Sequence, residues 1–122
     1  MFRIVAGLIG VFHAANGFYM VTAPERWFTG APGAMATGPF NSHFVMDVGF
    51  AFVAGGVAFL AFAWRPKLKL LALGASGFLV LHALFHLSNL IHGHMVHAIT
   101  DISIALPVIL GLAISWPRRG EV

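Results

Sequence analysis

The sequence predicts an all-α integral membrane protein, a four-helix bundle made of two tandem helical hairpins with both termini in the cytoplasm. Three observations predict this fold. Hydrophobic residues make up 59% of the 122-residue chain and charged residues only 9%, and a soluble domain of that composition would expose an apolar surface to water. Four apolar stretches are long enough to cross a hydrocarbon core. The basic residues lie beside these stretches in a pattern that sets one orientation.

The first span is predicted at residues 4–21, and we expect it to be retained. Arg3 followed by an apolar run also resembles a signal peptide. However, the run contains His13 and Asn16, polar residues that a discarded segment would not need. We therefore interpret this segment as an uncleaved membrane helix.

An outer loop is predicted at residues 22–42, because Pro, Gly and small residues are frequent there. We expect this loop to fold over the outer mouth of the bundle, with its aromatic residues, Trp27, Phe28 and Phe40, anchored in the membrane interface. The other three spans are predicted at residues 44–64, 68–91 and 98–116. The chain thus forms a single transmembrane domain, residues 1–122.

Orientation follows from the basic residues, since Lys and Arg are retained on the cytoplasmic side. Six of the seven lie at one end of the predicted spans, namely Arg3, Arg65, Lys67, Lys69, Arg118 and Arg119. Only Arg26 falls in an outer connection. The excess of basic charge is therefore explained by membrane topology, and no nucleic-acid partner is expected.

The two predicted hairpins resemble each other in sequence. His43 and Asp47 are separated by three residues at the start of one span, and His97 and Asp101 repeat this spacing at the start of another. The segment around His13 also aligns with the segment around His82. A duplication of this kind predicts a pseudo-twofold axis along the membrane normal, with His13 facing His82 and Asp47 facing Asp101.

All seven histidines and the only two acidic residues of the predicted spans lie in the outer half of the bundle. Titratable groups are costly at that depth, so their convergence indicates a function. Imidazole and carboxylate groups are ligands for transition metals. We therefore predict a metal site near the extracytoplasmic face, whose candidate ligands are Asp47, His86, Asp101, His82, His43, His97 and His13.

The metal itself is left open among copper, iron and zinc. His82 and His86 have the spacing of two ligands on one helix face, but Ala83 stands where a zinc protease motif has its catalytic Glu. The chain has no cysteine, which excludes disulfide chemistry, thiolate ligands and iron–sulfur clusters. Metal-dependent proteolysis is therefore not expected.

Three alternatives compete with a metal ion. His13 and His82 on facing helices are candidate axial ligands of a b-type haem. The same polar residues could instead stabilise the bundle by hydrogen bonds alone, giving a packing subunit without a cofactor. Transport of protons or cations is disfavoured, because the spans that carry Asp47 and Asp101 have no titratable residue below these two.

In length, four-helix layout and basic cytoplasmic end, the chain resembles the small bacterial membrane proteins of the DoxX type. The resemblance covers the whole length and rests on architecture. It implies a multi-pass protein of the bacterial inner membrane associated with a redox complex. We therefore expect an accessory or redox subunit that binds other membrane subunits or copies of itself, with an independent metal-dependent oxidoreductase as the other reading.

Overall fold

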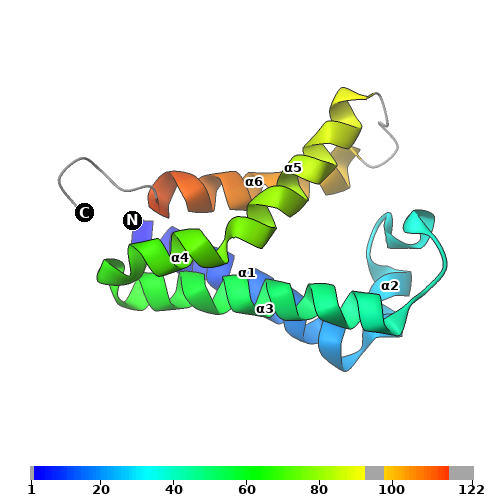
Figure 1. The fold of residues 1–122 in the computed structure, drawn as a ribbon, viewed down its shortest axis with the longest axis horizontal. Helices are drawn as coiled ribbons and strands as arrows, with labels where there is room; N and C mark the ends of the chain where they lie inside the picture. The colour runs from blue at the N-terminus through cyan, green and yellow to red at the C-terminus, as the bar shows by residue number, and fades with distance from the viewer. Residues whose placement is uncertain (1, 93–97, 116–122) are drawn as a thin grey trace.

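The computed structural model describes residues 2–92 and 98–115, and these residues form helices and turns without a strand. Helices α1 and α3 lie antiparallel along each other, α4 runs back beside α3, and α5 and α6 lie on the same side of this pair as α4 (Figure 1). The elements in chain order are α1 (Phe2–Thr22), α2 (Pro24–Gly30), η1 (Ala34–Thr37), α3 (Ser42–Trp64), η2 (Pro66–Leu68), α4 (Lys69–Ala75), α5 (Gly77–Ile91) and α6 (Ala98–Ser115).

Two described helices, α1 and α3, are each long and apolar enough to cross a membrane. Helices α4 and α5 meet the same criterion together, as one span bent by 51°. Many large apolar side chains on these helices are exposed, including Ile4, Leu8, Phe18 and Phe50. Such faces are stable in lipid, so the helices indicate a membrane protein. A fourth crossing by α6 stays a prediction.

Glycines bring α1 and α3 into close contact. Gly10 and Gly17 on α1 are seven residues apart, and so are Gly49 and Gly56 on α3. A Cβ added to Gly10 would lie 2.8 Å from the Gly56 carbonyl oxygen, and one added to Gly17 would collide with the Gly49 carbonyl oxygen. Small residues at helix interfaces let backbones approach closely in membranes. In this protein the small residues of α1 serve packing within the chain, against α3.

Arg3 links the two ends of this helix pair. Its Nε donates to the Ala63 carbonyl oxygen at 2.7 Å and its Nη2 to the Trp64 carbonyl oxygen at 3.0 Å. These carbonyls belong to the last turn of α3, which has no intrahelical donors left. The guanidinium of Arg65 also lies 4.9 Å from the Trp64 ring centroid. We call this the basic end of the molecule, and the opposite end, which carries α2, the loop end.

The loop end is more ordered than an open connection. Where the sequence predicts a loop at residues 22–42, the chain forms the short helices α2 and η1. The Trp27 Nε1–H donates to Asn16 Oδ1 at 2.9 Å, which fixes α2 against α1. The rings of Phe28 and Phe40 are 5.4 Å apart. The Asn41 side chain then caps α3 by accepting the Phe44 N–H at 3.1 Å.

The span predicted as one helix at residues 68–91 is two helices. The break falls at Ser76, which is fully buried and whose Oγ donates to the Leu73 carbonyl oxygen at 2.9 Å. Gly77 follows directly, and a Cβ there would meet nothing within 4 Å. A Ser hydroxyl that bonds back to its own helix, next to a Gly, is a common cause of a kink. Sequence periodicity continues through such a break and does not reveal it.

The core lies toward the basic end, where all four long segments meet. Phe59 and Phe62 of α3, Leu79 of α5 and Val108 of α6 are each 2% exposed or less. A Cβ added to Gly111 of α6 would lie 2.6 Å from the Phe59 ring, so this glycine makes room for the ring. Toward the loop end, α5 rises away from α3 and the bundle opens (Figure 1).

Candidate functional site

Three of the predicted site histidines lie in one row of rings that crosses the middle of the bundle. Helix α1 supplies His13, α3 supplies Phe52, and α5 supplies His82 and His86. The His13 ring stacks on Phe52 with centroids 5.5 Å apart, and Phe52 meets His82 edge-on at 5.4 Å. The His82 and His86 rings follow at 4.7 Å. The row thus connects the two halves of the predicted repeat.

His13 is the buried end of this row. Its side chain is 1% exposed, and neither ring nitrogen has a hydrogen-bond partner within the described part of the chain. Besides Phe52, its ring contacts the edge of Phe12 at 5.3 Å. A buried polar group without a partner costs about 1–3 kcal/mol and calls for an explanation. An imidazole in these surroundings retains a nitrogen lone pair that is available to a ligand.

The separation of the His82 and His86 rings is compatible with two ligands of one ion. At a metal–nitrogen distance of ~2.0–2.1 Å, an imidazole centroid lies about 3.2 Å from the ion. Two centroids 4.7 Å apart then subtend an angle of about 95° at the ion, within the range of four- to six-coordinate sites. Phe78 stacks on His82 at 5.5 Å and 20°, so one face of that ring is held by packing.

Phe52 separates the two histidines of the haem alternative. Its ring contacts both His13 and His82. A porphyrin ligated on both faces by these imidazoles would occupy the position of the Phe52 side chain, which is 6% exposed. Phe52 and Phe78 were not among the predicted site residues. Phe78, His82 and His86 follow one another at four-residue spacing, which was the available signal for the second of these rings.

Of the other predicted site residues, two are exposed on α3, and the other two lie wholly or in part outside the residues that the structure describes. His43 and Asp47 both lie exposed on α3, near the loop end. His97 and the side chain of Asp101 lie outside the described residues. Among the side chains that are described, no group of three or more His, Asp or Glu is close enough to hold an ion. The full ligand set therefore stays a prediction.

Two polar residues near the row make other contacts. Asn16, one turn beyond His13 on α1, accepts from Trp27 and donates through Nδ2 to Met20 Sδ at 3.6 Å. It therefore holds α2 in place. His92, at the end of α5, has its Nδ1 2.7 Å from the Ser88 carbonyl oxygen. This contact is local to the helix end, and His94 lies outside the described residues.

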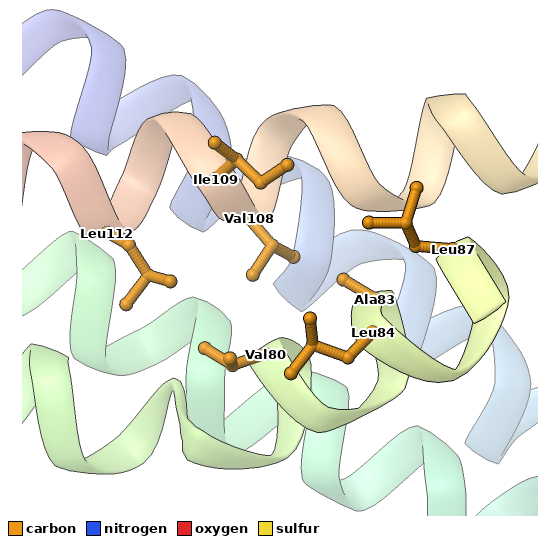
Figure 2. A pocket seen from close by; sticks show the side chains of 7 residues that line it. All are labelled: Val80, Ala83, Leu84, Leu87, Val108, Ile109 and Leu112. Carbon is orange, nitrogen blue, oxygen red and sulfur yellow. The ribbon is translucent and has the colours of Figure 1, made fainter. Parts of the chain in front are cut away.

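An apolar hollow of about 70 Å³ lies between α5 and α6. Figure 2 shows its lining, which comes from Val80, Ala83, Leu84, Leu87, Val108, Ile109 and Leu112. None of these side chains can ligate a metal or donate a hydrogen bond. The hollow lies on the side of α5 opposite to Phe52. An apolar ligand that entered it would therefore be separated by α5 from the histidines considered as metal ligands.

Comparison with known proteins returned no relative. A scan against protein-family models found no match, and neither a search of curated proteins nor one of solved structures found any. The resemblance to proteins of the DoxX type therefore has no support beyond architecture. Function has to be argued from the residues themselves.

Proposed function

We propose that this protein is a metal-binding membrane protein whose His82 and His86 bind one transition metal ion, and that it serves as an accessory or redox subunit of a larger membrane complex. The observation that carries the proposal is the 4.7 Å separation of the two imidazole rings on α5, which suits two ligands of one ion. Copper, iron and zinc all accept imidazole ligands. The sequence adds Asp47, Asp101, His43, His97 and His13 as candidates for the remaining positions.

The proposed orientation places the basic end in the cytoplasm of a bacterial cell and the loop end outside its inner membrane. Arg3 binds the last carbonyls of α3, so the start of the chain and the basic turn after α3 share one end. Basic residues are retained on the cytoplasmic side during insertion. With four crossings, the metal site then opens toward the extracytoplasmic side.

The role as a subunit follows from the small size of the site. The described residues line an apolar hollow between α5 and α6, and none of its lining residues is a histidine. The exposed aromatic faces of α1 and α3 suit lipid or another membrane helix equally. An accessory subunit, alone or paired with copies of itself, needs no substrate pocket of its own.

The decisive experiment is metal analysis of protein purified in detergent without a histidine tag. We expect about one equivalent of copper, iron or zinc and no Soret band. When the protein is loaded with Cu²⁺, electron paramagnetic resonance should show nitrogen couplings from two imidazoles. His82→Ala and His86→Ala should each remove one coupled nitrogen and weaken binding roughly tenfold or more.

His92→Ala is the matched control, since His92 directly follows the same helix and contacts its last turn through the Ser88 carbonyl oxygen. It should leave the affinity and the couplings unchanged. Stoichiometric metal that survives both His82→Ala and His86→Ala would overturn the proposed site. A Soret band would favour the haem alternative, and neither metal nor colour would leave a packing subunit.

A further inference from the structure

One face of α3 is buried near the basic end and exposed near the loop end. Six residues of α3 form a continuous stripe at helical spacing: Phe44, Asp47, Ala51, Gly55, Ala58 and Phe62. The three nearest the basic end are buried, Ala51 is half-buried, and Asp47 and Phe44 are exposed. Phe44 is 67% exposed. The same face is thus no longer covered from the middle of α3 toward the loop end.

The cover is lost because α5 leaves α3. The 51° bend at Ser76 directs α5 away from α3 as it runs toward the loop end (Figure 1). Close to the bend the helices still touch, since a Cβ on Gly55 would lie 2.8 Å from Leu79 Cδ1 and 3.6 Å from the Ala75 carbonyl oxygen. Without the bend, α5 would continue along the bare part of the stripe.

The register of this contact identifies which residues would meet. Gly55 lies between Ala75 and Leu79, and Phe52 contacts both Phe78 and His82. One step along α3 therefore matches one step back along α5, as in any antiparallel pair. Continued toward the loop end, this register sets Asp47 level with residue 85, next to His86. Ala75, Leu79, His82 and His86 also follow one another at the spacing of a single helix face.

The two glycines beside the break have open space next to them. Neither Gly74 nor Gly77 has an atom within 4 Å of the position where a Cβ would stand. His86 is nine residues beyond Gly77, about 14 Å along the helix, so each 20° of straightening moves it by about 5 Å. Hinges of this kind are a few residues at the ends of elements that absorb the backbone change.

We infer that α5 closes onto the bare part of the α3 stripe by partial straightening at Ser76 and Gly77, and that this closure brings the Asp47 carboxylate to a metal ion held by His82 and His86. The inference rests on the proposed metal site. It explains why no third ligand stands beside the two histidines among the described residues. It also gives the exposed carboxylate on an apolar helix a partner, which a charge at membrane depth needs. Metal binding would favour the closed form by its tighter affinity for that form.

The test is a distance measurement, which the absence of native cysteine makes direct. Spin labels at Phe50→Cys and Ile91→Cys report the separation of α3 from the end of α5, at exposed positions that spare the stripe. Zn²⁺ added to the protein in lipid nanodiscs should shorten this distance by roughly 10 Å for a 30° closure. Labels at Leu8→Cys and Val57→Cys, on the tightly packed α1 and α3, should show no change.

A variant at the carboxylate separates the two proposals. Asp47→Asn should abolish the zinc-induced shortening and weaken zinc binding about tenfold, whereas Glu25→Gln, an exposed acid at the same end, should alter neither. Zinc that binds through His82 and His86 without shortening the labelled distance would overturn the closure and leave the proposed function standing. Absence of binding by zinc, copper and iron alike would overturn both. Shortening that persists in Asp47→Asn would remove Asp47 from the site.

Discussion

Two polar side chains of α1, His13 and Asn16, differ in their hydrogen bonding. His13 is buried with both ring nitrogens unpartnered in the described structure, while Asn16, one turn away, is engaged by Trp27 and Met20. Helical spacing places both residues toward the interior, so the sequence does not distinguish them. The difference arises because α2 folds back over α1 and delivers the Trp27 indole to one of them only.

At this scale we predict that the Trp27 hydrogen bond stabilises the fold measurably. Trp27→Phe removes the indole N–H and leaves the Asn16 oxygen without its donor, which should lower the free energy of unfolding by about 1 kcal/mol. Thermal unfolding in detergent measures this change. Trp64→Phe is the control, because Trp64 is 72% exposed. In a double-mutant cycle, Asn16→Ala should add little to Trp27→Phe, and full additivity would mean that the bond contributes nothing.

Among the elements, α1 and α3 form a closely packed pair. Helix α5 is the element for which we infer movement relative to this pair. The backbones of α1 and α3 approach so closely that Gly10, Gly17, Gly49 and Gly56 leave no space for a Cβ. Helix α5 contacts α3 from the break at Ser76 as far as His82 and then departs (Figure 1). Close backbone packing is lost when a helix bends away, so the rigid pair provides the frame against which α5 can move.

The glycine contacts lead to a prediction for the helix pair. Gly10→Ala and Gly17→Ala should each force α1 and α3 apart and lower stability by about 1–3 kcal/mol, the usual cost of overpacking. Gly7→Ala on the same helix is the matched control, since its Cβ would stand 3.9 Å from the Ala63 Cβ in ordinary contact. It should be neutral or slightly stabilising, because Ala favours a helix more than Gly does. Equal effects of all three substitutions would show that packing does not distinguish these sites.

For the whole molecule, polarity is arranged along the long axis. Arg3 and Arg65 lie at the basic end, with their guanidinium groups on carbonyls and on the Trp64 ring. The loop end carries α2, and the row of imidazole and aromatic rings lies between the two ends. The proposed cytoplasmic position of the basic end rests on this clustering of basic residues.

The predicted topology can be tested with single cysteines. Thr37→Cys, in the exposed part of the loop end, should react with a membrane-impermeant maleimide added to intact cells. Lys67→Cys, in the exposed turn after α3, should react only after the membrane is opened. The reverse labelling pattern would invert the orientation and place the proposed site on the cytoplasmic side.

The sequence by itself determined the apolar character of the helices, the bounds of α1 and α3 to within a few residues, and the clustering of basic residues at one end. These follow from local composition and spacing, which act over one or two turns of helix. It also paired His82 with His86, because a four-residue spacing on a helix fixes the distance between two side chains.

Only the tertiary structure decided that the segment after the basic turn breaks at Ser76, that Phe52 stands between His13 and His82, and that Asp47 is exposed. A Ser and a Gly inside an apolar helix are compatible with a straight or a bent chain, and packing selects between the two. Which residue faces which across a bundle depends on the tilt of whole helices. That tilt is set by the sum of many weak contacts, such as those of Gly55 with Leu79, and no local pattern encodes it.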